Sequence, residues 1–313
     1  MSGIAQYGAA LDALYQNFNA AFDEGYSAIN DQNNLPWWDK VAMRIDSTTD
    51  EEVHTWIQQI PEVREWLGDR HFAALSEASY RLKNRHFERS VAVNKNRLHD
   101  RRISVEAPLM RSLGRAFRKF PDRAIASELL IGYASRKCWD GLSFFNDTHY
   151  VDPLNTAAGS FDNLRASTAL TAANFDTVYA DMCGFEGPDG QPLGIVPDTL
   201  IVPPTLRTTA LLIAKAAYVP SAAGTATQTN VNEGTVDVLV IPELASESTT
   251  WYLASLKGAF KPLIVQVREE PVFELILGPD SDHCRKKNEL VYGADCRYAF
   301  GYGLPQLMVR CTA

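Results

Sequence analysis

The sequence predicts an α+β fold, because helical and strand patterns occur in different parts of the chain. Apolar side chains recur at steps of three and four within residues 3–28 and again within 104–135, which is the period of a helix with one buried face. Residues 236–313 instead alternate apolar and polar side chains between Gly and Pro residues, which is typical of strands. The 313 residues, 46% of them apolar, are enough for a sizeable core in one large domain or two smaller ones.

Residues 3–28 predict an amphipathic helix with a narrow apolar stripe. The stripe consists of Ile4, Tyr7, Leu11, Leu14, Phe18 and Phe22. The polar segment 30–36 ends in a proline, so the helix should stop there and a linker should begin. A helix on a linker is rarely stable by itself and needs a docking surface on its own chain or on another. Because the stripe is narrow for a core helix, we expect it to dock on a neighbouring molecule, and removal of residues 1–30 to leave unfolding nearly unchanged.

Residues 37–100 predict a long, embellished β-hairpin with strand candidates at 41–46 and 80–94. Large apolar residues lie between these strands: Trp56, Ile60, Trp66 and Leu67. A hairpin of this size buries little surface by itself, so exposed apolar side chains on it mark a surface that contacts other molecules.

The remaining elements follow from the same two periods. Residues 104–135 predict a long helix that Pro121 should kink or restart, and helical steps recur near 163–183 and 205–217. The segment 221–234 is rich in small and polar residues and is expected to form a flexible loop. Strands are expected at 236–241, 251–256, 263–268, 272–277 and 296–309.

Composition and charge argue against several classes of protein. A formal net charge of -8 is opposite to the basic excess of most nucleic-acid-binding domains. The five cysteines are odd in number, contain no CxxC pair, and fit a reducing cytoplasm better than a disulfide framework. The N-terminus lacks the basic and apolar regions of a signal peptide, and no apolar run is long enough to span a membrane. We therefore expect a soluble protein that is not exported and has no membrane partner.

No residue pattern indicates catalysis, a cofactor or a metal site. The metal-capable residues His283, Cys284 and Cys296 lack a spaced second pair of His or Cys. The other histidines are scattered, without HxxxH or HExxH, and neither GxSxG nor GxxxxGK[ST] occurs. We interpret these residues as structural, and we expect no catalytic residue, no cofactor and no metal.

The densest positive charge lies at residues 81–102. Its first four basic residues are Arg81, Lys83, Arg85 and Arg89. Such a stripe could contact DNA phosphates. A solvated or subunit-facing strand with an acidic partner is favoured, because acidic residues lie on the opposite arm of the same hairpin: Asp46, Asp50, Glu51 and Glu52.

Seven collinear stretches resemble the Mu-like phage major head subunit family. They are WIQQIPEVREWLGDR (56–70), RHFERSVAVNKNRL (85–98), APLMRSLGRAFRKFPD (107–122), CWDGLSFFNDTHYV (138–151), GQPLGIVPDTLIVPPTLRTTA (190–210), WYLASLKGAFKPLIVQVREEP (251–271) and YGADCRYAFGYGLPQL (292–307). The resemblance covers roughly residues 50–310 in order, and residues 1–50 match only in character.

The resemblance implies the Hong Kong 97-type capsid fold. Its segments would be an N-terminal arm (1–36), an extended loop (37–100), a peripheral domain with a long spine helix (101–151), an axial domain (152–235) and a return to the peripheral sheet (236–313). It implies a major capsid protein whose pentamers and hexamers form an icosahedral head around double-stranded DNA. Portal, scaffold and protease proteins would act during assembly in the host bacterial cytoplasm, the product would be the virion capsid, and the presence of a decoration protein stays open.

We expect one set of side chains at the subunit interfaces: Tyr7, Leu11, Leu14, Phe18, Phe22, Trp56, Ile60, Trp66, Leu67, Arg81, Lys83, Arg85 and Arg89. Two other functions remain open. A nanocompartment shell of the same fold would need a cargo-docking groove and would hold no DNA. A cytoplasmic nucleic-acid-binding protein would use residues 81–102 and would bind DNA with a strong dependence on salt.

Overall fold

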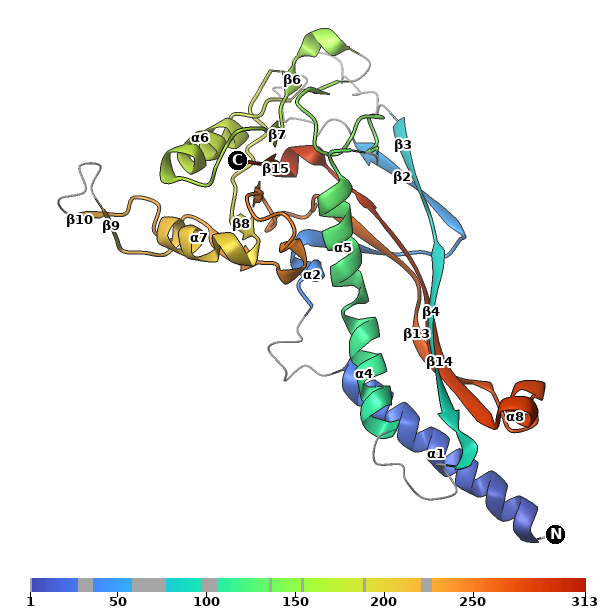
Figure 1. Ribbon diagram of the computed structural model, residues 1–313. Helices are drawn as coiled ribbons and strands as arrows, with labels where there is room; N and C mark the ends of the chain where they lie inside the picture. The colour runs from blue at the N-terminus through green and yellow to red at the C-terminus, as the bar shows by residue number, and fades with distance from the viewer. Residues whose placement is uncertain are drawn as a thin grey trace.

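A computed structural model of the chain describes residues 2–27, 36–57, 77–96, 106–134, 137–152, 155–187, 190–220 and 227–313. The molecule is elongated, with a wide end and a stalk of helices and long strands that runs toward the N-terminus (Figure 1). One β-sheet lies along the stalk and a second lies in the wide end. Helices and strands are both abundant, which confirms the predicted α+β class.

The sheet along the stalk is built around one long antiparallel ribbon. Its strands, in spatial order, are β1 (Ala42–Asp46), β13 (Leu263–Leu277), β14 (Glu289–Tyr302) and β4 (Arg85–Asn94). Helix α8 (Asp282–Lys287) joins the two long strands. The register of β13 shifts between Glu269 and Val272, so two strands predicted from the sequence are one strand with a bulge. Pro271 stands in this bulge, where a residue without an N–H is tolerated.

Three helices cover one face of this sheet. They are α1 (Ser2–Tyr26), α4 (Glu106–Arg118) and α5 (Phe120–Ile131). Helices α4 and α5 part at Lys119, and Pro121 lies in the first turn of α5, as the sequence predicts. The short helix α2 (Trp38–Val41) leads into β1.

The apolar stripe of α1 is buried inside its own subunit. Phe18 is fully buried and meets Tyr292 edge to face at 5.1 Å, and Phe22 lies 5.3 Å from Phe273. Leu14 belongs to the same cluster, and Leu11 packs against it. The sequence correctly indicates the stripe, but in the subunit the surface that covers it is α4 with β13 and β14, not another molecule. Contact of α1 with a neighbour stays a prediction, and the side chain of Tyr7 lies outside the described residues.

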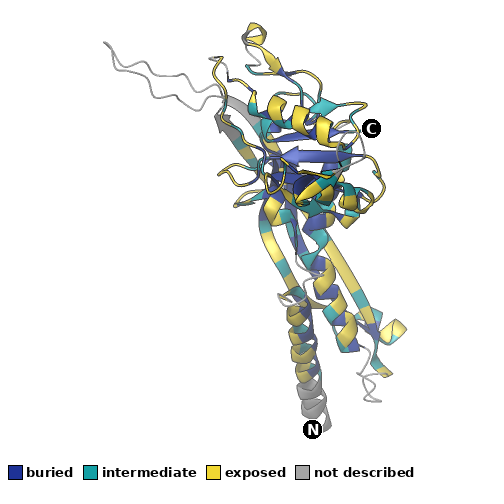
Figure 2. Ribbon diagram, turned by 90° about the vertical axis from the view of Figure 1, so that its left-hand side faces the viewer, coloured by how far each residue is buried: buried dark blue, intermediate teal, exposed yellow. Residues whose placement is uncertain are grey.

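The second sheet has helices on one face and the end of α5 on the other. Its strands, in spatial order, are β11 (Asp237–Val240), β8 (Thr199–Val202), β12 (Trp251–Ala254), β15 (Met308–Cys311) and β7 (Leu164–Arg165). Leu200 and Val202 pack with α6 (Ala172–Cys183) and α7 (Arg207–Ala214), whereas Ile201 between them faces the stalk core. Figure 2 shows these strands buried beneath exposed helices.

Strands from residues 236–313 occur in both sheets. Strands β13 and β14 lie in the stalk, while β11, β12 and β15 join β7 and β8 in the wide end. A division of the chain at residue 235 therefore does not separate the two sheets.

The described residues also form three separate pairs of strands. They are β2 (Glu51–Ile57) with β3 (Glu77–Lys83), β5 (His149–Tyr150) with β6 (Ser160–Phe161), and β9 (Tyr218–Pro220) with β10 (Thr227–Thr229). Short 3-10 turns lie at η2 (Thr156–Ala158), η3 (Pro204–Leu206), η4 (Pro242–Leu244) and η5 (Pro305–Leu307). The predicted hairpin is thus confined to β2 and β3, since the flanking strands β1 and β4 belong to the stalk sheet.

Candidate assembly surfaces

The root of the β2–β3 hairpin packs on the second face of the stalk sheet. Leu82 on β3 is buried with Ile264 and Ala299. A Cβ at Gly301 would meet the methyl groups of Leu82, so a larger residue there would force the Leu82 side chain to move. His54 Nε2 and Gln266 Oε1 lie 2.9 Å apart across the same contact. The root is therefore fixed to its own subunit.

A buried polar network closes the root of the hairpin. The side-chain amide of Asn84 donates to Ser47 Oγ at 2.9 Å and accepts from Gln266 Nε2 at 2.8 Å. Glu52 accepts hydrogen bonds from the backbone N–H groups of Thr48 and Thr49 and from the hydroxyl of Ser47. These bonds favour the charged carboxylate and lower the pKa of Glu52 to about 2. The ionised Glu52 side chain thus bridges Ser47, Thr48 and Thr49 in the turn between β1 and β2.

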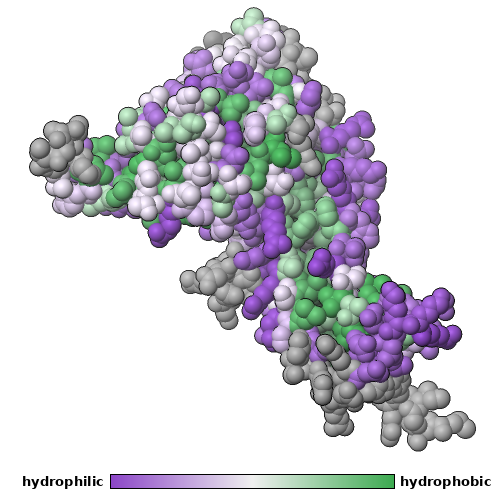
Figure 3. All heavy atoms as spheres, in the orientation of Figure 1, coloured by the Kyte–Doolittle hydropathy of each residue, from purple (hydrophilic) through white to green (hydrophobic). Residues whose placement is uncertain are grey.

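The first four basic residues of the stripe, Arg81, Lys83, Arg85 and Arg89, are all exposed. Lys83 Nζ lies 3.7 Å from Asp50 on the opposite arm, which is the acidic partner that the sequence indicates. Within the part of the chain that the structure describes, Arg81, Arg85 and Arg89 form no ion pair. Hydrophilic side chains accordingly cover the margin formed by β3 and β4 (Figure 3).

A groove of about 510 Å³ opens at this root. Its lining combines aromatic side chains (Tyr80, Phe87 and Phe300) with basic ones (Arg81, Arg85 and Lys137). This composition suits an acidic or amphipathic segment of a partner. The hairpin residues that were expected at an interface are not placed by the structure: Ile60, Trp66 and Leu67 lie outside the described residues, and so does the side chain of Trp56.

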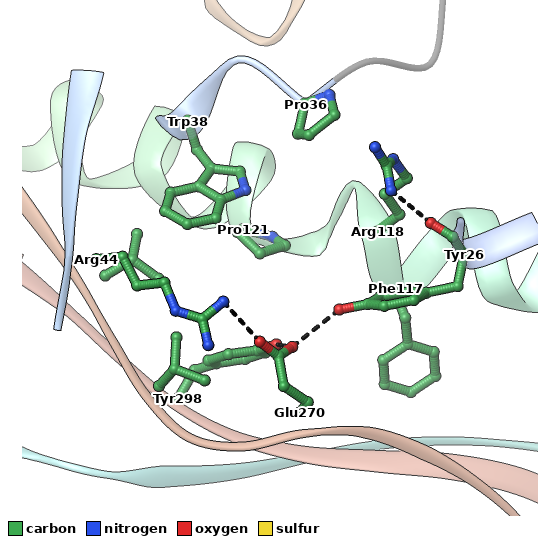
Figure 4. A pocket seen from close by; sticks show the side chains of 11 residues that line it. Tyr26, Pro36, Trp38, Arg44, Phe117, Arg118, Pro121, Glu270 and Tyr298 are labelled. Atoms are coloured by element: carbon green, nitrogen blue, oxygen red, sulfur yellow. Dashed lines mark hydrogen bonds and ion pairs between the residues drawn. The ribbon is translucent and has the colours of Figure 1, made fainter. Parts of the chain in front are cut away.

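The end of α1 is tied to the bulge of β13 by Glu270 (Figure 4). The hydroxyls of Tyr26 and Tyr298 donate to Glu270 Oε2 at 2.9 and 2.7 Å, and Arg44 lies 2.8 Å from Oε1. Arg118 Nη1 donates to the backbone carbonyl of Tyr26 at 2.6 Å. Burial, followed by the charge of Glu270, raises the pKa of Tyr26 far above its usual range, so its hydroxyl stays a donor. These residues surround a pocket of about 130 Å³.

A second cluster was not found from the sequence. Cys138, Asp140 and His149 bring a thiol, a carboxylate and an imidazole within 4.8 Å of one another. Burial opposes ionisation of Asp140, but hydrogen bonds from His149 and Cys138 outweigh it and hold its pKa below the usual range. The signal in the sequence was a CxD pair followed by His149, which is too short and too common to stand out. His283, Cys284 and Cys296 form no such cluster in the described ranges.

None of the helices in the described ranges is both long and apolar enough to cross a membrane.

Solved structures with this arrangement include phage capsids. The procapsid protein of bacteriophage JBD30 aligns with a TM-score of 0.57 at 24% identity, over 97% of this chain and 75% of that chain. A structure from Microbacterium phage Oxtober96 aligns with a TM-score of 0.54 at 13% identity, over 88% of this chain and 90% of that chain. The sheet with its long helices, the rooted hairpin and the second sheet thus have the Hong Kong 97-type capsid fold, as predicted.

The sequence comparisons specify the family. The chain belongs to the Mu-like prophage major head subunit family, whose model matches residues 11–169, and the phage capsid protein model matches residues 98–310. The chain is 23% identical to the major capsid protein of Escherichia phage Mu over 96% of its length and 73% of that protein. It is 23% identical to the Mu-like prophage FluMu major head subunit of Haemophilus influenzae, over 95% and 71%.

Proposed function

We propose that pentamers and hexamers of this capsid protein tile an icosahedral head that encloses double-stranded DNA. The observation that supports this most is the hairpin, which is rooted by Leu82 and Asn84, together with the exposed arginines at its root. Arg81 on β3 and Arg85 and Arg89 on β4 form no ion pair with the described part of the subunit. A subunit that contacts several neighbours in a shell can use such a projection on a fixed base. Several weak contacts of this kind on each subunit give a shell that dissociates slowly.

The interface proposal concerns the hairpin and its basic root. Arg81, Arg85 and Arg89 would meet acidic surfaces of adjacent subunits, while Trp56, Ile60, Trp66 and Leu67 would supply the apolar contacts. The chain carries 38 acidic and 30 basic residues, so acidic surface is available on other copies. For α1 we propose a neighbour contact only around Tyr7 and Leu11, because Leu14, Phe18 and Phe22 are buried in their own subunit.

Contact with DNA is proposed to be non-specific and weak per subunit. A net charge of -8 leaves little surface for phosphate neutralisation. A nanocompartment shell of the same fold would hold a cargo and no DNA, so the presence of DNA inside purified particles separates the two functions.

We further propose that the chain catalyses no reaction. Portal, scaffold and protease proteins act with it in the host cytoplasm, and a decoration protein is an optional partner.

Charge reversal at the root tests the interface. We expect Arg81→Glu with Arg85→Glu to leave a folded subunit, because both side chains are exposed, and to reduce the yield of closed particles several-fold. Arg285→Glu with Lys287→Glu on α8 makes the same change of charge at exposed positions and serves as the control. Equal particle yields from the two double variants would contradict the proposed role of the root.

A further inference from the structure

The cluster of Cys138, Asp140 and His149 is buried and its three polar groups face one another. The side chains of His149 and Asp140 are 0% and 3% exposed, and Cys138 is 4% exposed. His149 Nδ1 lies 2.5 Å from Asp140 Oδ2, and Cys138 Sγ lies 2.8 Å from Asp140 Oδ1. No other group of three metal-capable side chains occurs among the residues that the structure describes.

The hydrogen bonds determine which ring nitrogen of His149 carries a proton. Nε2 lies 3.1 Å from the carbonyl oxygen of Phe144, which can only accept, so Nε2 is the donor. Nδ1 faces the Asp140 carboxylate at 2.5 Å, so either a proton or a metal cation must lie between these two acceptor atoms. A divalent cation can take the place of that proton. A histidine that donates its outer N–H to a backbone carbonyl is also the usual arrangement around a metal-binding imidazole.

We propose that Cys138 Sγ, the Asp140 carboxylate and His149 Nδ1 bind one divalent ion of the zinc class. Thiolate, imidazole and carboxylate are the donors that zinc takes in proteins, and a water molecule would fill the fourth position. Thiolate and carboxylate together neutralise the ion, so the buried site carries no net charge. On binding, the proton of the thiol and any proton on Nδ1 leave to solvent.

The site needs little rearrangement. Bonds of about 2.0 Å at the tetrahedral angle separate two ligand atoms by about 3.3 Å, so the Nδ1 to Oδ2 edge must open by less than ~1 Å. The turn that carries Cys138 and Asp140 is already fixed, because Cys138 N donates to Leu142 O at 2.8 Å and Leu142 N donates to Asp140 Oδ1 at 2.9 Å. Gly141 supplies the positive φ of 80° that this turn requires.

The position of the site gives the ion a structural role. Cys138 belongs to the stalk core, whereas His149 stacks on Phe161 of the other core at 5.2 Å. Asn163 strengthens the same junction by donating to the carbonyls of Phe144 and Pro305. A bound ion would therefore link the segment after α5 to the wide end and stabilise the folded chain. This inference concerns the subunit itself and does not depend on shell formation.

Metal titration of the purified full chain tests the site. After removal of metal, the wild-type chain should take up one Zn²⁺ per subunit by elemental analysis, and Co²⁺ should produce a thiolate-to-metal charge-transfer absorption. Cys138→Ser should lower the affinity for Zn²⁺ at least tenfold and abolish that absorption. The control Cys311→Ser changes another buried, free cysteine and should bind as wild type does.

Thermal unfolding gives an independent readout. Zn²⁺ should raise the Tm of the wild-type chain and of Cys311→Ser but not of Cys138→Ser. The proposal is overturned if the folded wild-type chain binds less than stoichiometric Zn²⁺ and gives no Co²⁺ absorption, a result that needs no variant to fold. It is also overturned if Cys138→Ser retains the metal.

Discussion

Gly114 on α4 lies directly against the backbone carbonyl of Phe22 on α1, with no room for a methyl group between them. Gly25 on α1 makes the reciprocal approach to the carbonyl of Arg111. Two helices whose backbones touch at paired glycines are packed as parts of one core. In this conformation α1 is a structural helix of the subunit.

Gly114→Ala should therefore separate α1 from α4. The added methyl group meets main-chain atoms, which cannot rotate away, so we expect a loss of about 1–3 kcal/mol in the free energy of unfolding. Urea unfolding of the isolated subunit measures it. Gly258→Ala is the control, because its nearest contact would lie at an ordinary 3.7 Å, and it should change stability by less than about 0.5 kcal/mol. Equal effects of the two substitutions would argue against the close packing of the helices.

Phe22→Ala should destabilise the isolated subunit by about 3–5 kcal/mol, because it removes a fully buried ring from a contact with Phe273 and Phe117. Tyr218→Ala, at an aromatic residue that is 68% exposed, should lower the free energy of unfolding far less.

Removal of residues 1–27 should destabilise the subunit as well. This is the opposite of what the narrow apolar stripe of residues 3–28 predicts from the sequence alone. Unchanged thermal unfolding of the truncated chain would restore the interpretation of α1 as an independent arm.

Asp122 should make stability fall as the pH rises toward neutrality. Burial raises the pKa of Asp122 from 3.8 to about 6, against the hydrogen bonds from the backbone N–H groups of Trp38 and Trp37. Because the folded chain holds the Asp122 proton more tightly than the unfolded chain does, ionisation of Asp122 lowers the free energy of unfolding. This loss of stability is absent below pH 3.8 and complete above about pH 6. Between pH 5 and 7 the free energy of unfolding should fall by about 1 kcal/mol from this group.

Asp122→Asn tests that slope, because its side-chain oxygen can still accept from Trp37 and Trp38 without a charge. The variant should lose about 1 kcal/mol of the pH dependence and be at least as stable as wild type at pH 7. Asp39→Asn, at an exposed carboxylate, should retain the wild-type slope. Urea unfolding at three pH values gives the comparison, and identical slopes for wild type and Asp122→Asn would contradict the assignment.

Local signals in the sequence predicted most of the elements. The helical period and Pro121 located the break between α4 and α5, and alternation located most strands of the two sheets. Alternation also divided β13 at Pro271, because a bulge shifts the inward-facing positions within one strand. These local signals could not predict which strands pair, because β1 pairs with β13, a strand more than 200 residues away in the sequence.

The sites depended on contacts between distant residues. The stripe of α1 was visible, but periodicity gives only the buried face of a helix and not what covers it. Glu270 and Tyr26 meet across 244 residues, and no local pattern marks either as a partner of the other. The family resemblance supplied the function, while the interface residues expected on the hairpin stay predictions.

Electron microscopy of particles from cells that express the full chain together with its own scaffold protein is the most direct test of its role as a shell subunit. We predict closed icosahedral particles with clusters of five and six subunits, in which the β2–β3 hairpin contacts an adjacent subunit. A chain that stays monomeric, or that forms only irregular aggregates although the scaffold is present, would contradict this.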